Sequence, residues 1–166
     1  MTKRAETDEM TGFYTRAAAE RCIGKVLSEN EDAMYAFFLF DIDNFKQAND
    51  RFGHVFGDMA IKEFTAVIRG HFCENDILGR IGGDEFAAFL PAENLETVEA
   101  KATEISLSLS RTFTDGVSSW KMSASIGVAV APRDGKDFVS LYKNADAALY
   151  ETKQRGKNGY TISGRL

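Results

Sequence analysis

The sequence predicts one α/β (α+β) domain over residues 1–166, in which helices surround a central, mostly antiparallel sheet of five strands. Three observations favour this fold. The length suits one domain with one core. Short apolar runs alternate with segments of helical periodicity, and a Gly-Gly pair separates two of these runs. Because 44% of the residues are hydrophobic and 13 are Phe, the core can be filled without disulfides or structural metals.

Four segments have apolar residues at the i, i+3 and i+4 spacing of amphipathic helices. They lie around residues 19–27, 61–68, 95–109 and 138–149. Asp137 is suited to cap the last of them. A further short helix is expected over residues 44–50.

Five apolar runs are too short for helices and are the candidate strands. They span residues 35–40, 77–81, 85–90, 122–130 and 160–163. Gly82-Gly83 predicts a tight hairpin between the second and third, because Gly readily adopts the positive φ that such a reversal needs. This order of elements indicates a sheet with split βαβ character.

The composition excludes several classes of function. A net charge of −5 and a pI near 5.1 argue against binding to nucleic acid or to an anionic membrane surface. The apolar runs, such as Met34–Phe40, are all far shorter than the ~20 residues that span a bilayer. Cys22 and Cys73 lack the spacing of a metal or redox motif and are expected to be reduced thiols. We therefore expect a cytoplasmic domain.

The first group of candidate functional residues is Asp41 and Asp43, which end an apolar strand and lie on the same face of it. A carboxylate at a buried strand end needs a cation or hydrogen-bond donors, and Mg²⁺, or Mn²⁺ in its place, is a natural partner. A helix cap or solvated turn is the commoner role for an isolated pair. The next residues, Asn44–Asp50, predict a short helix whose N-terminal amides and Lys46 would form a phosphate cradle, although a lone Lys is more often a surface charge.

The second group is the acidic pair Asp84 and Glu85 after the Gly-Gly turn. Adjacent strand residues face opposite ways, so only one of the two is expected to share a metal site with Asp41, leaving the other to approach a reacting hydroxyl. Taken alone, the pattern is an ordinary acidic hairpin tip.

The third group is a helix that ends in Lys153, Arg155 and Lys157, with Gly156 as a stop. These cations suit a helix C-terminus, and polyphosphate binding is the alternative. Together the three groups supply the parts needed for two-metal phosphoryl or nucleotidyl transfer. Their spacing does not reveal the nucleotide.

Five ordered blocks, from about residue 8 to about residue 163, resemble the GGDEF family of diguanylate cyclases, which condense two GTP molecules into cyclic di-GMP and pyrophosphate. The resemblance implies a nucleotide-cyclase or palm-like sheet with the signature on a β-hairpin. The matching segments are Asp8–Arg16, Phe40–Lys46 with Asn49–His54 and Gly57-Asp58, Gly82–Phe86, Ser125–Ala129 and Ala145–Asn158.

The resemblance also implies roles for the acids. Asp41, Asp84 and the backbone carbonyl of Ile42 are the implied metal ligands, and Asp41, Asp84 and Glu85 are the implied catalytic residues. Glu85 is assigned to metal support or to activation of the 3′-hydroxyl. Asp43 matches the family pattern but is interpreted as a structural acid.

Substrate contacts are implied at seven further positions. Asn49 and Asp58 would read guanine, because a carboxylate accepts from both N1–H and the 2-amino group, a donor pair that adenine lacks. The phosphates would be held by Asn44, Phe45, Lys46, Lys153 and Lys157. Position 157 more often carries Arg in this family, so a weaker phosphate contact is expected there.

The family's chemistry needs a homodimer, because each subunit holds one GTP. Its members commonly carry sensory or dimerising segments upstream, so we expect this chain to be an excised domain of a larger protein, which could itself be membrane-anchored. The family's product-inhibition site, Arg-x-x-Asp, is degenerate here, since Cys73 replaces the Arg and Asp76 remains. We expect little tight product feedback there.

Two rival functions remain. The chain could be a catalytically silent GTP-binding or interaction module of the same family, although an intact signature disfavours this. It could also be a mononucleotide cyclase or polymerase-like palm domain, which would share the acidic strand ends but has no reason to carry Asn49 and Asp58 together.

Overall fold

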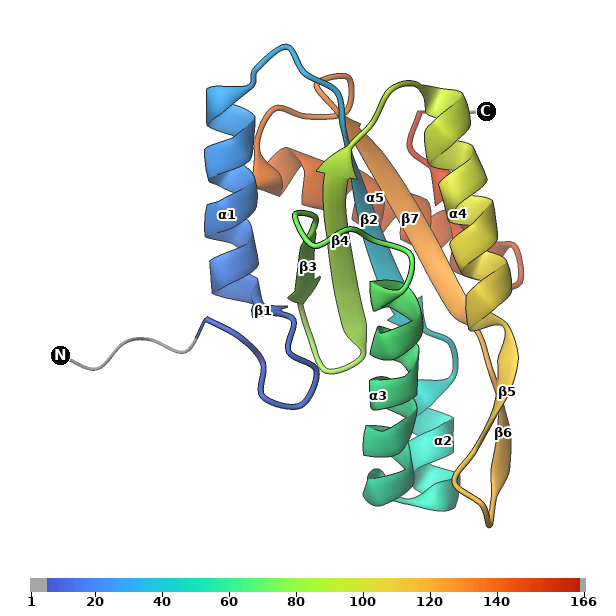
Figure 1. The fold of residues 1–166 in the computed structure, drawn as a ribbon. Helices are drawn as coiled ribbons and strands as arrows, with labels where there is room; N and C mark the ends of the chain where they lie inside the picture. Colours follow the sequence, from blue (N-terminus) through green and yellow to red (C-terminus); the bar gives the residue numbers. More distant parts are fainter. Residues whose placement is uncertain (1–5, 165–166) are drawn as a thin grey trace, which may run out of the picture.

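The computed structural model describes residues 6–164, in which helices pack on both faces of a central sheet (Figure 1). The helices are α1 (Arg16–Glu29), α2 (Phe45–Phe52), α3 (His54–Arg69), α4 (Leu95–Leu109) and α5 (Phe138–Gln154). The strands are β1 (Tyr14–Thr15), β2 (Tyr35–Ile42), β3 (Ile77–Arg80), β4 (Glu85–Pro91), β5 (Arg111–Thr114), β6 (Ser119–Met122), β7 (Ala124–Ala131) and β8 (Gly159–Ile162).

The central sheet has six strands in the order β1-β3-β4-β2-β7-β8, rather than the five predicted. Its middle is antiparallel, because β2 pairs in that sense with both β4 and β7. The outer pairs, β1 with β3 and β7 with β8, are parallel. The additional strand is β1, which has two residues and so gives no readable periodicity in the sequence.

The predicted strand over residues 122–130 is divided in the structure. Met122 ends β6, which forms a separate two-stranded ribbon with β5, and Ala124 begins β7. The break falls at Ser123, whose carbonyl accepts from the N–H of Asp43 at 2.9 Å and whose hydroxyl donates to the Asp43 carboxylate at 2.7 Å. Because Ser123 makes these bonds to the turn after β2, the predicted strand is interrupted there and continues as two separate strands, β6 and β7.

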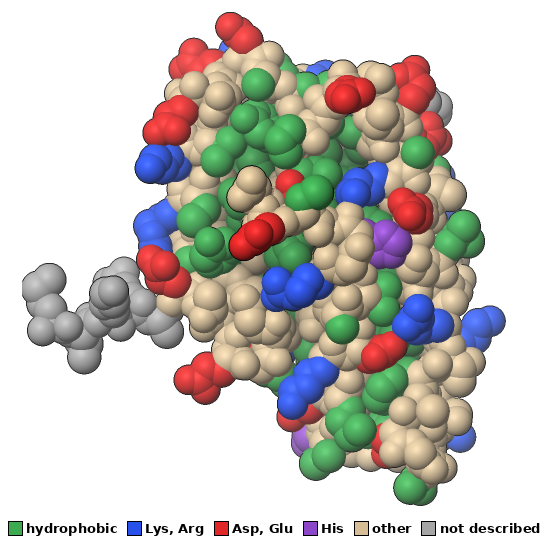
Figure 2. Space-filling model, in the orientation of Figure 1, with side chains coloured by type: hydrophobic (Ala, Val, Ile, Leu, Met, Phe, Trp, Pro, Cys, Tyr) green, Lys and Arg blue, Asp and Glu red, His purple; other side chains and the backbone are tan. Residues whose placement is uncertain are grey.

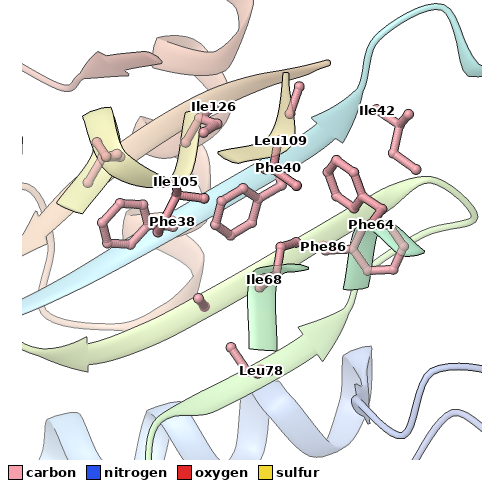
Figure 3. Close-up of a cluster of buried hydrophobic side chains, with 14 of the residues drawn as sticks. Phe38, Phe40, Ile42, Phe64, Ile68, Leu78, Phe86, Ile105, Leu109 and Ile126 are labelled. Atoms are coloured by element: carbon pink, nitrogen blue, oxygen red, sulfur yellow. The ribbon is translucent and has the colours of Figure 1, made fainter. Parts of the chain in front are cut away.

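The two faces of β2 belong to two different hydrophobic clusters. Phe38 and Phe40 pack with side chains of α3 and α4, as Figure 3 shows for Phe64 and Ile105. Phe37 and Leu39 face α1 and α5. Because both faces are covered, the strand is a nearly continuous apolar run. This run ends where the polar residues of the candidate site begin.

Helix α5 lies unusually close to the sheet at Gly127 of β7. A Cβ added to Gly127 would lie 2.0 Å from the carbonyl oxygen of Ala145 and 2.4 Å from the backbone nitrogen of Leu149. The Thr152 hydroxyl donates to the carbonyl of Ile126 at 2.9 Å, one turn further along the helix. The absence of a side chain at residue 127 therefore sets the height of α5 above the sheet.

Two surface properties bear on the sequence expectations. Within residues 6–164, no helix has both the length and the apolar composition needed to cross a bilayer. Figure 2 shows acidic and basic side chains interspersed over one face of the molecule, without a large area of a single sign.

Candidate functional site

The acidic residues of the two strand ends lie side by side. Asp41 is directly opposite Glu85 in the register of β2 and β4, and both are on the face that α1 and α5 cover. The next residue, Ile42, donates its N–H to the carbonyl of Asp84 at 3.2 Å. The structure therefore brings Asp41, Asp84 and Glu85 together. Glu85 is the acid opposite Asp41, while Asp84 lies in the turn before β4.

A cation from α5 reaches Asp41. Lys153 forms an ion pair with the Asp41 carboxylate, which is 15% exposed. Burial raises the pKa of Asp41 to about 6; the Lys153 hydrogen bond opposes this, and the charges of Asp84 and Glu85 reinforce it. The ionised form of Asp41 is thus costly here unless a cation accompanies it.

Glu85 has a different partner. Its Oε1 accepts from the hydroxyl of Tyr142 on α5 at 2.7 Å. Burial raises the pKa of Glu85, the Tyr142 hydrogen bond opposes that shift, and the nearby charges of Asp146 and Asp84 add to it. Sequence reasoning missed Tyr142, because the apolar spacing of its helix marks it only as a core position.

Asp43, the second acid after β2, is buried and points into the protein. It accepts from the hydroxyls of Ser123 and Ser125 at 2.7 and 2.6 Å and from the N–H of Asn158 at 2.9 Å. All three donors come from segments far along the chain. Asp43 is thus a structural acid, as interpreted from the sequence.

The signature turn is held by Arg80, a second contribution that sequence reasoning missed. Its guanidinium donates to the carbonyls of Gly82 and Gly83 at 3.3 and 2.7 Å. It also pairs with the carboxylate of Asp8 at 3.2 Å. An Arg two residues before Gly82, with an acid in the opening motif, is the signal that could have found it. The turn is thereby tied to the first described residues of the chain.

The predicted base-reading residues lie on consecutive helices. Asn49 is on α2, and its Oδ1 is buried without a hydrogen-bond partner among the described residues. A Cβ on Gly57 of α3 would lie 1.7 Å from that oxygen, so the glycine provides the space for Asn49. Asp58 follows it and is exposed. The two residues thus offer an unsatisfied acceptor on α2 and an exposed carboxylate on α3, which suit a ligand that presents donors.

The predicted phosphate-binding residues come together only in part. Asn44, with φ of 57°, precedes the first turn of α2, and its Oδ1 accepts from the Lys157 ammonium at 2.7 Å. The end of α5 and the loop after it therefore bring both Lys153 and Lys157 to the end of β2. Phe45 begins α2, and Lys46 is exposed on that helix without contact to these two cations. Backbone amides at such a helix start favour anions.

The degenerate product-inhibition residues lie at the opposite end of β3 from the signature turn. Asp76 accepts from the N–H of Cys73 at 2.8 Å and so closes its own loop. Both residues line a hollow of about 440 Å³, together with Arg69 from the end of α3. A guanidinium is therefore present near Asp76, although it comes from a different position than the family pattern has.

The acidic group offers suitable donors for a hard divalent cation. Carboxylates of Asp41 and Asp84 and the carbonyl of Ile42 are the all-oxygen set that Mg²⁺ prefers. Among residues 6–164, no three His, Cys, Asp or Glu side chains are gathered closely enough to bind a metal in this conformation. Instead the Lys153 ammonium sits on Asp41. The donors fit Mg²⁺ in kind, and an ion bound to Asp41 would have to displace Lys153.

Comparisons with known proteins identify similar sequences and a similar fold. The chain matches the family model described as "Diguanylate cyclase, GGDEF domain" over residues 5–159. It is 35% identical over 155 residues to the bifunctional diguanylate cyclase/cyclic di-GMP phosphodiesterase MucR of Pseudomonas aeruginosa. It is 30% identical over 158 residues to the cyclic di-GMP phosphodiesterase PdeR of Escherichia coli. These matches cover 92% and 95% of this chain but only 23% and 24% of the two relatives.

A solved structure is similar over nearly its whole length. The GGDEF domain of DgcB from Caulobacter crescentus, in complex with c-di-GMP, has a TM-score of 0.89 and 29% sequence identity to this chain. The alignment covers 99% of this chain and 97% of that one. The sheet with its surrounding helices, including the signature hairpin, is therefore the fold of that domain.

Proposed function

The chain belongs to the GGDEF (diguanylate cyclase) domain family, and on this premise we propose that it condenses two GTP molecules into cyclic di-GMP and pyrophosphate. One observation carries the proposal. Asp41 of β2 lies opposite Glu85 of β4 and beside Asp84, at the strand end that Lys153 and Lys157 also reach. Acids and cations at one strand end are the groups that nucleotidyl transfer requires.

Asp41, Asp84 and the carbonyl of Ile42 would hold Mg²⁺, or Mn²⁺ in its place. When bound, the ion supplies positive charge to the reacting phosphate oxygens. The protein's own contribution begins with Lys153, which leaves Asp41 and becomes free to contact phosphate. Lys157 is already held at the start of α2 by Asn44. With Lys46 and the amides of residues 44 and 45, these cations would orient the triphosphate.

Guanine would be selected by Asn49 and Asp58. The Asp58 carboxylate can accept from N1–H and the 2-amino group together, and the buried Oδ1 of Asn49 needs a donor. Adenine has neither an N1–H nor a 2-amino group, so it would leave Asp58 without this pair of donors. For the buried Oδ1 of Asn49, a missing donor costs about 1–3 kcal/mol, whereas the exposed Asp58 carboxylate can bind water instead and contributes less.

Turnover would require two copies of the chain. The 3′-hydroxyl of one GTP must attack the α-phosphorus of the other in line, with pyrophosphate leaving, and this happens twice to close the ring. Glu85 is proposed to support the ion or to accept the hydroxyl proton. Since the chain spans about a quarter of the two curated relatives, a neighbouring sensory or dimerising domain would hold the two copies together.

The direct experiment is incubation with GTP and Mg²⁺, followed by chromatographic separation of the products. Cyclic di-GMP is expected, with specific activity that rises steeply with protein concentration. Asp84→Ala should abolish product while preserving the circular dichroism spectrum and the unfolding midpoint. A flat concentration dependence would refute the dimer requirement, and a mononucleotide product would instead indicate a mononucleotide cyclase.

The second candidate is a silent GTP-binding module. It is favoured by the similarity to PdeR, whose name gives phosphodiesterase activity alone. Calorimetry with GTP, read together with the chromatogram, separates the two candidates. Both would bind GTP, but only the cyclase would form cyclic di-GMP.

A further inference from the structure

Tyr142 connects α5 to the signature acid. Its hydroxyl donates to Oε1 of Glu85 at 2.7 Å. Its ring is held from two other directions, since the guanidinium of Arg16 lies 5.1 Å from the ring centroid and the ring of Phe138 stacks at 6.0 Å. The hydroxyl is therefore aimed at Glu85 by a ring that is fixed in place.

This hydroxyl is a permanent donor. A phenol keeps its proton throughout the neutral range, so the Tyr142 hydroxyl remains a donor to Glu85 there. Within residues 6–164, Tyr142 is the one side chain that donates a hydrogen bond to Glu85. Without this donor, the partly buried Glu85 carboxylate would lose its largest compensation for desolvation and would keep only the smaller one from the charge of Lys153.

Glu85 also needs to be held against repulsion. Asp84 and Asp146 lie near enough for their charges to act on its carboxylate, and Asp41 is directly opposite. An untethered Glu85 side chain would lower its energy by turning away from these charges toward water. The bond from Tyr142 opposes that rotation.

We propose that Tyr142 is a positioning residue, which holds the Glu85 carboxylate in the orientation that the reaction and the divalent ion use. The inference rests on the proposed cyclase function. It adds a residue that lies on α5 rather than in the signature or the metal-binding strand. Its hydroxyl acts through Glu85 and does not touch substrate.

Tyr142→Phe is the appropriate variant, because Phe keeps the ring contacts with Arg16 and Phe138 and removes only the donor. Tyr150→Phe is the matched control, since Tyr150 is on the same helix and 63% exposed. We expect Tyr142→Phe to lower kcat about tenfold while the KM for GTP stays within about twofold, because guanine and phosphate contacts come from other residues. Tyr150→Phe should change neither. An unchanged kcat in Tyr142→Phe would overturn the proposal.

A second measurement does not depend on turnover. Mn²⁺ alone is titrated into the wild type, Tyr142→Phe, Glu85→Gln and the double variant, and free Mn²⁺ is followed by electron paramagnetic resonance. Tyr142→Phe should weaken Mn²⁺ binding about threefold or more in the wild-type background and have no further effect beside Glu85→Gln. Equal effects in both backgrounds, or none in either, would overturn the proposal. If the wild type forms no cyclic di-GMP, the cyclase function fails while this cycle still decides the role of Tyr142.

Discussion

Lys153 donates a hydrogen bond to the carboxylate of Asp41, although the two residues are 112 positions apart in the chain. The ammonium thus occupies the carboxylate that is proposed to bind the metal. In the absence of nucleotide, an incoming ion has to displace it. In the presence of GTP, the phosphates offer Lys153 a new partner, so metal and substrate binding should support each other.

The first prediction concerns this competition. Lys153→Met should strengthen Mn²⁺ binding to the nucleotide-free domain about fivefold, because a partly exposed ion pair worth ~1 kcal/mol no longer has to be broken. The same variant should weaken GTP binding, since a phosphate contact is lost. Titration of Mn²⁺ and calorimetry with GTP measure the two effects. Lys143→Met, an exposed Lys on the same helix, is the control, and weaker Mn²⁺ binding in Lys153→Met would contradict the competition.

The second prediction concerns pH and stability. The pKa of Asp41 is raised from 3.8 to about 6 in the folded domain. Between these values the folded state keeps a proton that the unfolded state has released, so Asp41 lowers the free energy of unfolding as pH rises from about 4 to about 6. Asp41→Asn should therefore be more stable than the wild type at pH 7, by on the order of 1 kcal/mol, without metal.

Urea unfolding from pH 4 to pH 8 tests this, and the difference should vanish at the acidic end. Asp115→Asn is a control for which the stability change should have the opposite sign. Backbone hydrogen bonds lower the pKa of Asp115, so removing its carboxylate should destabilise the domain at neutral pH. If Asp41→Asn proves less stable than the wild type at pH 7, the burial cost assigned to Asp41 is wrong.

A third prediction concerns guanine recognition. Gly57→Ala places a methyl group where Oδ1 of Asn49 now lies, so the Asn49 side chain has to move. We expect the fold to persist, the KM for GTP to rise about tenfold, and discrimination against ATP to fall. Gly24→Ala is the matched control in α1, because a Cβ there meets no atom within 4 Å. Unchanged GTP kinetics in Gly57→Ala would argue against a role of Asn49 in base binding.

A fourth prediction concerns product feedback. Calorimetry with cyclic di-GMP should show no tight binding that depends on Asp76, because Cys73 supplies no guanidinium. Cys73→Arg should gain at least about tenfold in affinity, while Cys73→Lys, with the same charge but without the planar fork, should gain less. Tight binding to the wild type that disappears in Asp76→Ala would show instead that Arg69, in the same hollow, replaces the missing Arg.

The strands that form the candidate site were predictable because their chemistry is local. The apolar run before Asp41 indicates a buried strand end, and the Gly-Gly pair before Asp84 indicates a reversal, although neither Gly82 nor Gly83 has the positive φ expected there. The register between β2 and β4 could not be predicted from the sequence. Alternation of side chains allowed only one of Asp84 and Glu85 to join Asp41, but which of the two lies opposite Asp41 depends on how β2 pairs with β4.

Contacts from α5 were beyond sequence reasoning. Lys153 with Asp41 and Lys157 with Asn44 join residues more than a hundred positions apart, and both depend on how the helix lies over β7. Tyr142 was missed for the same reason. Its position in the apolar pattern predicts packing against the core, but it does not predict that the hydroxyl reaches Glu85 on β4. The β5–β6 ribbon was missed because its residues are mostly exposed and lack a core-facing pattern.

Gly127 determines the positions of both α5 side chains that contact the acidic strand end. Since α5 rests directly on this residue, a single added methyl group would lift the helix from the sheet. Tyr142 and Lys153 would then be displaced in concert, each losing reach toward its acid. Substitutions in the loops and on the exposed helix faces would leave the contact between α5 and β7 intact, whereas a side chain at residue 127 would disturb the whole acidic strand end.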